Sequence, residues 1–195
     1  MSEVIKIANC SGFYGDNLSI AKKMVEGGPI DVLTGDYLAE LTMTILYNQK
    51  MKRGENLGYV GTFLKQFRDV AKLCNDQNIK IVSNAGGLNP ASMAAEVENI
   101  IKELNLDLKV AYIDGDDLMP RLDELSSSGE KLKNIDKNND LFSYEKKPLT
   151  ANAYLGAWGI KEALDNGADV VICPRVTDAA VVIGPAAWKF NWSRN

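Results

Sequence analysis

Histidine is absent from the 195 residues of this chain. It is the commonest general base in enzymes and the usual partner of a serine or cysteine nucleophile, so its absence excludes Ser-His and Cys-His catalytic pairs within the chain. The three cysteines, Cys10, Cys74 and Cys173, are widely separated and show no CxxC spacing, which indicates neither a disulfide framework nor a zinc site. Any chemistry must therefore use carboxylates, Lys, Tyr, Arg, Asn or backbone N–H groups.

Basic clusters and long apolar runs are also missing. The net charge is −4 without a basic block, which argues against binding to nucleic acid or to an anionic membrane. The longest apolar runs have the length of strands, and the N-terminus lacks the features of a signal peptide. We therefore expect a cytoplasmic protein with a small-molecule ligand.

The chain does have a repeated order of apolar strand, small or polar turn and amphipathic helix. With 46% hydrophobic and 25% charged residues, it is predicted to form a single α/β domain over residues 1–195. We expect a mainly parallel sheet with flanking helices, in a Rossmann-like layered architecture. The strand candidates are Val4–Ala8, Ile30–Leu33, Ile79–Ser83, Leu108–Ile113 and Ala168–Cys173.

Apolar stripes between these strands predict helices. Two are clear, one from Val60 to Cys74 and one from Met93 to Leu104. A further helix is expected over about Asn152–Asn166, where Gly167 ends it. Another stripe follows Gly35-Asp36 and consists of Leu38, Leu41, Ile45 and Leu46.

Two segments depart from this order. Residues 126–150 are rich in Ser, Asn and mixed charge, so we expect a loop or weak hairpin that is either a flexible solvated insertion or a lid. The C-terminal segment carries apolar residues without an evident partner, so we expect a second domain or subunit to cover them and the chain to be incomplete at this end. These residues are Val181, Val182, Ile183, Trp188 and Trp192.

The segment from Ile79 to Pro90 combines a strand, a tight turn and a helix start. The turn, residues 84–87, can bring backbone N–H groups close to a ligand, and Asn89 is expected to cap the following helix. The positive end of that helix then favours an anion or a developing oxyanion. The alternative is a plain connection between strand and helix.

Six short blocks follow one another along the chain: NCSGFYGD at 9–16, LTGDYLAELTM at 33–43, VSNAGGLNP at 82–90, DGDDL at 114–118, TANAYLGA at 150–157 and PRVTDAAVVIGP at 174–185. This succession resembles the N-terminal domain of the acyclic terpene utilisation family, over essentially the whole chain. The family takes its name from bacterial pathways that degrade citronellol and geraniol through coenzyme A thioesters. The resemblance implies a role in acyl-CoA or related branched-carbon catabolism, without a defined reaction or catalytic residues.

All these blocks except TANAYLGA follow a predicted strand, and the carboxyl ends of parallel strands meet at one edge of a sheet. We therefore expect a shared pocket there. Arg175 is the only cation among the strand-end residues, so it either anchors a carboxylate, thioester oxygen or phosphate, or forms a salt bridge with Asp178 or another acid. The candidate ligand-binding residues are Ser11, Gly12, Asp16, Asn84, Gly86, Gly87, Asn89, Asn152, Arg175 and Thr177.

Asp36, Glu40 and Asp178 are the candidate catalytic carboxylates. Asp36 and Glu40 are expected on one face of a helix start, where they form a general acid/base pair if burial raises one pKa. Alternatively, Asp36 caps the helix, Glu40 is solvated, and Asp178 caps the last helix. Asp114 and Asp116 are weak candidates for Mg²⁺ ligands, with turn and cap roles as the alternative, and no other metal site is indicated.

Three functions are compatible with these observations. The first is an enzyme that binds an organic acid or acyl-CoA thioester and catalyses a lyase or hydratase reaction, with no cofactor beyond CoA as part of the substrate. The second is a nucleotide- or cofactor-binding module at the first loop, although Cys10 replaces the first glycine of a GxGxxG motif. The third is a non-catalytic subunit or truncated remnant of a larger assembly.

Overall fold

The computed structural model describes residues 4–194. Within them, five short strands form one parallel sheet in the order β1-β2-β3-β5-β4. The predicted α/β fold with a parallel sheet is confirmed, and each predicted strand overlaps an observed one. The strands are β1 (Ile7–Asn9), β2 (Val32–Gly35), β3 (Lys80–Ser83), β4 (Val110–Tyr112) and β5 (Val170–Ile172).

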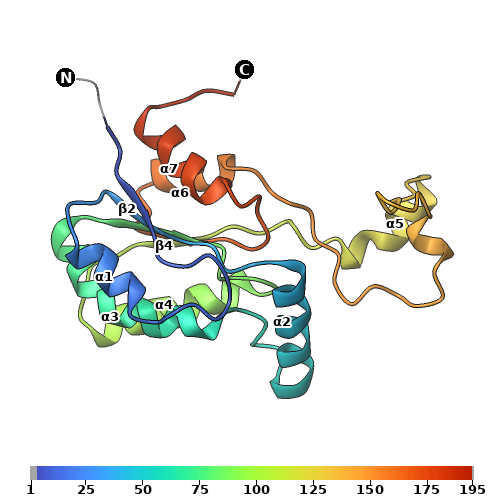
Figure 1. Ribbon diagram of the computed structural model, residues 1–195, viewed down its shortest axis with the longest axis horizontal. Helices are drawn as coiled ribbons and strands as arrows, with labels where there is room; N and C mark the ends of the chain where they lie inside the picture. The colour runs from blue at the N-terminus through green and yellow to red at the C-terminus, as the bar shows by residue number, and fades with distance from the viewer. Residues whose placement is uncertain (1–3, 195) are drawn as a thin grey trace.

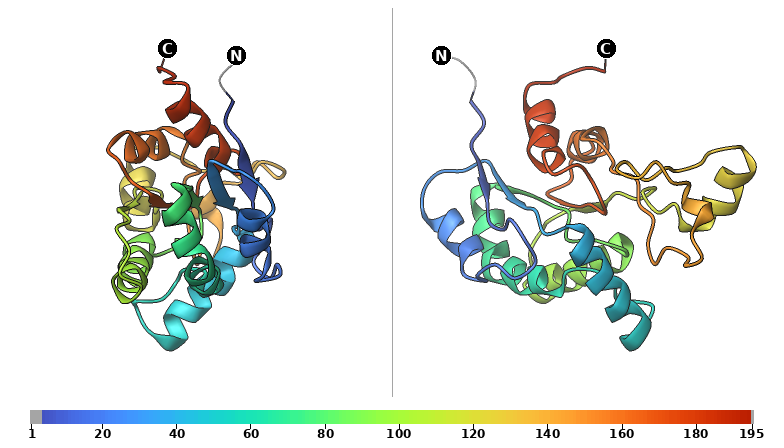
Figure 2. Two further views of the ribbon diagram at one scale, coloured as in Figure 1. Left: turned by 90° about the vertical axis from the view of Figure 1, so that its left-hand side faces the viewer. Right: turned by 45° about the vertical axis from the view of Figure 1, so that its right-hand side comes forward.

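Helices cover both faces of the sheet (Figure 1). On one face lie α1 (Ile20–Glu26), α3 (Gly61–Gln77) and α4 (Pro90–Glu103), and on the other lie α6 (Trp158–Asp165) and α7 (Ala180–Lys189). The two further views in Figure 2 show the same three layers. The sheet is therefore buried from both sides, as expected for parallel strands joined by helical crossovers.

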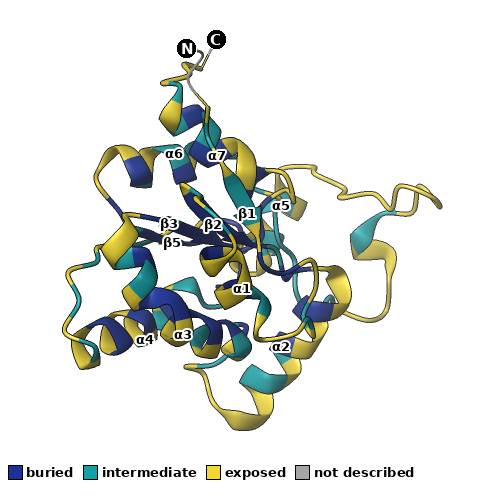
Figure 3. Cartoon of the chain, turned by 60° about the vertical axis from the view of Figure 1, so that its left-hand side comes forward, coloured by how far each residue is buried: buried dark blue, intermediate teal, exposed yellow. Residues whose placement is uncertain are grey.

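Alternating side chains of the strands supply two cores. Leu33 and Ile81 pack with the helices of the first face, around the stacked rings of Phe63 and Phe67 on α3. Their neighbour Val82 packs on the opposite side with α6 and α7. Figure 3 shows the central strands β2, β3 and β5 as mostly buried. Because successive strand residues point to opposite faces, the apolar runs of these strands match burial on both sides.

The order of the strands creates a switch point. The chain moves outward from β3 through α4 to β4, and then returns to place β5 between β3 and β4. As a result, β3 leads into α4 on one face, whereas its neighbour β5 leads into α7 on the other. Ligands of open parallel sheets bind outside the carboxyl ends of the strands at such a point.

Two segments lie outside the three layers. The helix α2 (Glu40–Arg53) extends from the edge of the sheet, and an excursion of residues 113–157 projects beyond it (Figure 1). The excursion contains a 3₁₀ turn at Met119–Arg121, the short α5 (Leu122–Ser127) and a second 3₁₀ turn at Leu141–Ser143. Residues 126–147 are almost all exposed, as expected for a loop.

Two helix predictions were wrong in detail. The helix expected from Asn152 begins only at Trp158, because Asn152 and Leu155 form isolated bridges with Asp117 and Val176 and keep the chain extended. In α2, the predicted stripe lies partly on the wrong face. Leu41 and Ile45 are exposed, and the residues that α2 buries are Thr42, Met43 and Leu46.

The C-terminal helix α7 is partly covered. Val181 is buried between α7 and its neighbours, whereas Val182 and Ile183 on α7 and Trp192 beyond it are exposed. Between residues 4 and 194, none of the helices is both long and apolar enough to cross a membrane.

Candidate functional site

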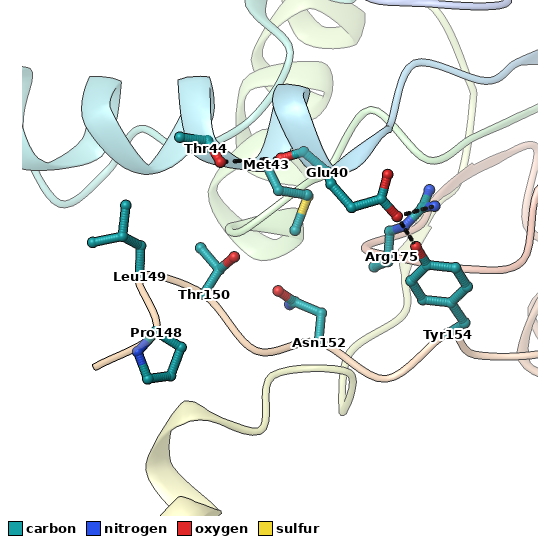
Figure 4. A pocket seen from close by; sticks show the side chains of 9 residues that line it. All are labelled: Glu40, Met43, Thr44, Pro148, Leu149, Thr150, Asn152, Tyr154 and Arg175. Carbon is teal, nitrogen blue, oxygen red and sulfur yellow. Dashed lines mark hydrogen bonds and ion pairs between the residues drawn. The ribbon is translucent and has the colours of Figure 1, made fainter. Parts of the chain in front are cut away.

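A hollow of about 400 Å³ lies where three segments meet (Figure 4). They are α2, the loop between β5 and α7, and residues 148–154, which we call the returning arm of the excursion. We call this cavity the Arg175 hollow. Its volume falls within the range of small-molecule sites, and its wall mixes apolar and polar side chains, as such sites do. The lining residues are Glu40, Met43, Thr44, Pro148, Leu149, Thr150, Asn152, Tyr154 and Arg175.

Arg175 is almost completely buried, with 5% of its side chain exposed. Its Nη1 donates to the carbonyl of Leu38 at 2.7 Å. Two carboxylates are close but beyond normal hydrogen-bond length, since Asp178 Oδ1 is 3.5 Å from Nη1 and Glu40 Oε1 is 3.9 Å from Nη2. A guanidinium carries five N–H donors, so part of the donor capacity of Arg175 is not taken by short hydrogen bonds to residues 4–194.

Tyr154 joins Glu40 to Arg175. Its ring stacks on the guanidinium, with the Arg175 Cζ 4.1 Å from the ring centroid, and its hydroxyl donates to Oε1 of Glu40. This hydrogen bond is the main reason that the pKa of Glu40 lies below its usual value, and Arg175 contributes less. Glu40 is therefore ionised at neutral pH, and its carboxylate is held at the rim of the hollow although it is 81% exposed.

Asp36 lies beside the hollow rather than in its wall. Its Oδ1 accepts a hydrogen bond of 2.5 Å from Asn84 Nδ2. Burial raises the pKa of Asp36, the hydrogen bond from Asn84 opposes this, and the charge of Asp178 adds to it. The structure thus brings Asp36, Glu40 and Asp178 together around one arginine, whose charge in turn favours the ionised form of Asp36.

The prediction that Asp36 and Glu40 share a helix face was wrong. The helix α2 begins at Glu40, and its N-cap is Ala39, so Asp36 belongs to the preceding loop. The cap alternatives were also wrong, because neither Asp36 nor Asp178 caps a helix. The side chain of Ala39 makes no cap hydrogen bond, and the N-cap of α7 is Ala179 rather than Asp178.

Asp116 connects two walls of the hollow. Its Oδ2 accepts from Asn152 Nδ2 at 2.8 Å and from the backbone N–H of Arg175 at 3.1 Å, and burial raises its pKa. Asp114 is exposed and does not line the hollow. In the part of the chain that the structure describes, no group of three or more His, Cys, Asp or Glu side chains is placed to hold a metal ion. Through its hydrogen bonds with Asn152 and with the backbone of Arg175, Asp116 fastens the returning arm of the excursion to the loop after β5.

In the turn after β3, residues 84–87, the backbone N–H groups are bonded within the protein. Those of Ala85, Gly86 and Gly87 donate to acceptors inside the protein at 3.1, 3.0 and 3.3 Å. Gly86 bonds to the carbonyl of Cys173, and a Cβ at Gly86 would lie 2.6 Å from that oxygen. The turn thus ties the end of β3 to the end of β5, which favours the interpretation as a structural connection over an oxyanion site.

Asn89 caps α4, as the sequence predicted. Its Oδ1 accepts from the backbone N–H of Ser92 at 3.2 Å, and Pro90 occupies the first helical position. Its Nδ2 donates to the carbonyl of Leu57 at 3.2 Å, which fastens the start of α4 to the segment that precedes α3. Both ends of the Asn89 amide are therefore used within the protein.

In the first loop, which follows β1, the carboxylate of Asp16 is hydrogen-bonded to residues of the same loop. Asp16 Oδ2 accepts from the backbone N–H groups of Gly12 and Phe13 at 2.7 and 3.3 Å, and from the hydroxyl of Ser11 at 3.3 Å. Consecutive N–H groups of this kind are the donors that bind phosphate in nucleotide sites. Here Asp16 occupies them, so this geometry does not favour the nucleotide-binding alternative.

The three cysteines are free and buried. Burial raises the pKa of each thiol, to about 12 for Cys74. None of them is therefore poised to form a reactive thiolate at neutral pH.

Of the predicted site residues, Glu40, Asn152 and Arg175 line the hollow. Thr177 is exposed on the neighbouring loop, where its N–H donates to Leu155 at 2.9 Å. Sequence reasoning missed Tyr154 and Thr150, although both belong to the TANAYLGA block, whose match was the available signal. It also missed the apolar wall formed by Met43, Pro148 and Leu149.

Residues 5–195 match the model of a family described as acyclic terpene utilisation family protein AtuA. No curated protein and no solved structure shows significant similarity to the chain.

Proposed function

The chain belongs to the acyclic terpene utilisation (AtuA) family, and from this membership and the Arg175 hollow we propose that it binds an organic acid or an acyl-CoA thioester in that hollow. The observation that carries the proposal is that Arg175 is buried in the wall of the hollow without a short salt bridge to a carboxylate. A guanidinium with 5% exposure in the wall of a cavity, whose two nearest carboxylates stay at 3.5 and 3.9 Å, is suited to a two-pronged hydrogen bond with a ligand carboxylate or to a thioester oxygen.

In this proposal the reaction is of the lyase or hydratase type. Such reactions need a group that stabilises negative charge on the substrate oxygen and a group that exchanges a proton with carbon or water. Arg175 supplies the first. Glu40 lines the hollow and is therefore the first candidate for the proton-exchanging group, with Asp36 and Asp178 as the other two carboxylates near Arg175.

The proposal also covers the compartment, the cofactor, the excursion and a partner. The protein acts in the cytoplasm on a small molecule, CoA enters only as part of the substrate, and residues 126–150 form a flexible insertion or a lid. A second domain or subunit covers the exposed apolar residues at the C-terminal end, which are Val182, Ile183 and Trp192.

The test compares Arg175→Met with Arg121→Met. Arg121 is a matched control because it is an exposed arginine on the excursion, paired with Glu124 outside the hollow. Butanoate and butanoyl-CoA are titrated into each variant by isothermal titration calorimetry, and far-UV circular dichroism verifies folding. A hydrogen bond to a charged group contributes about 1.5–3 kcal/mol, so Arg175→Met is expected to weaken binding of at least one ligand roughly 10- to 100-fold.

Arg121→Met is expected to bind as the wild type does. The proposal is refuted if folded Arg175→Met binds both ligands with unchanged affinity, or if the wild type binds neither.

A further inference from the structure

A second hollow, of about 220 Å³, adjoins the Arg175 hollow. Both are lined by α2 and by the same two residues of the excursion, Leu149 and Thr150. The side chain walls of the two hollows are therefore continuous along one side of α2. The second hollow is lined by Tyr47, Lys50, Met51, Glu55, Leu88, Asp117, Met119, Leu149 and Thr150.

Large apolar side chains collect around this second hollow. Met51, Met119 and Leu149 are 60%, 36% and 50% exposed, although they come from three separate segments of the chain. Single exposed apolar residues are ordinary, but several that converge on one concavity indicate a surface that contacts an apolar group. Met43 and Leu149 line the first hollow, and Leu149 also lines the second.

The basic residues of the two hollows, Arg175 and Lys50, differ in how far their charges are paired within the protein. In the first, Arg175 keeps donor capacity beyond its 2.7 Å bond to Leu38. In the second, the charge of Lys50 is paired with Glu55, whose Oε2 is 3.4 Å from the Lys50 Nζ, and Asp117 Oδ1 accepts a hydrogen bond from the backbone N–H of Met119 at 2.9 Å. The far hollow therefore does not call for a second anionic group on the ligand, and its apolar side chains suit a hydrocarbon tail.

The length of α2 sets the scale of this arrangement. Glu40 at the first hollow and Met51 at the second are separated by about 16 Å of helix, at the usual rise per residue. A short acid fits within the first hollow, whereas only a longer one can also reach the apolar walls of the second.

We propose that the ligand is an elongated amphipathic monocarboxylic acid, free or as a thioester, whose acyl head lies at Arg175 and whose apolar tail passes Leu149 into the second hollow. This inference rests on the proposed function, because it uses the same anchor. It adds that the second hollow determines selectivity for chain length.

The experiment measures the affinity of straight-chain carboxylates from butanoate to decanoate for the full chain, by calorimetry below their micelle concentrations. Complete burial of a methylene contributes up to about fourfold in affinity, so the wild type is expected to bind each longer acid more tightly through the series. Met51→Trp fills the second hollow from an exposed position, and it is expected to abolish the gain for the longest acids without changing the affinity for butanoate.

Met24→Trp is the control, because Met24 is an exposed methionine on α1 that lines neither hollow. It is expected to preserve the whole series. The inference is overturned if butanoate binds in an Arg175-dependent manner but affinity does not rise with chain length, or if Met51→Trp leaves decanoate binding unchanged. If none of the acids binds to the wild type, this inference fails, and the proposed function fails with it only if butanoyl-CoA does not bind either.

Discussion

Replacement of Glu40 by Gln is expected to tighten the binding of a carboxylate at Arg175. Glu40 Oε1 lies 3.9 Å from Arg175 Nη2, so its negative charge competes with an incoming acid for the same guanidinium and also repels it. Glutamine removes the charge, and its amide oxygen can still accept the hydrogen bond from the Tyr154 hydroxyl. The substitution therefore changes the electrostatics of the hollow more than its shape.

The size of the effect follows from the distance and the exposure. Two unit charges 4 Å apart interact by about 1 kcal/mol in water and about 4 kcal/mol at an effective dielectric constant of 20. Glu40 is 81% exposed, which places it near the aqueous limit, where measured ion pairs contribute about 0.2–1 kcal/mol. The expected gain in affinity is therefore about 1.5- to 5-fold, and it should diminish as added salt screens the charges.

The assay is calorimetric titration of Glu40→Gln with butanoate at low and at high salt. Glu124→Gln removes the same charge from an exposed ion pair outside the hollow, so it separates the local effect from the change in net charge. Weaker binding of butanoate by Glu40→Gln, with Glu124→Gln unchanged, would show that Glu40 attracts the ligand, and the assignment of an acid to this hollow would be wrong.

Three further outcomes are expected. Burial raises the pKa of Asp36, so its ionised form costs stability as the pH rises from its unfolded-state value near 4 through the folded-state value; Asp36→Asn should therefore stabilise the chain against urea at pH 7, with the gain disappearing towards pH 3.5. Tyr154→Phe keeps the ring over the arginine but removes the hydrogen bond to Glu40, so a ¹³C NMR titration should show the pKa of Glu40 rising; an unchanged pKa would contradict the assigned cause. Gly86→Ala places a Cβ 2.6 Å from a backbone oxygen and should lower the melting temperature by several degrees, whereas Gly61→Ala, where a Cβ meets no atom within 4 Å, should not; equal effects would refute the close-packed turn.

The strands and the main helices were predictable because their signals are local. The apolar runs at Ile79–Ser83 and Ala168–Cys173 match strands that are covered on both faces, and the stripes of α3 and α4 match their buried sides. The place of β5 between β3 and β4 has no local signal, because it depends on which way the crossovers pack. The sequence pattern therefore gave the class of fold but not the switch point.

The candidate site shows the same division. Arg175 could be selected as the only cation among the strand-end residues, and Asn152 could be included because its block matched the family. The contact of Tyr154 with Arg175 could not be predicted, since it requires the excursion to return across α2 and to be fastened by Asp116. Local periodicity favoured a helix at that point, but tertiary bridges hold the segment extended.

A crystal structure of the chain saturated with decanoate would test the central claim most directly. The account predicts that the carboxylate lies within about 2.7–3.0 Å of the Arg175 guanidinium nitrogens, and that the alkyl chain runs past Leu149 towards Met51. The account would be contradicted if the acid occupied another surface while the Arg175 hollow held only solvent.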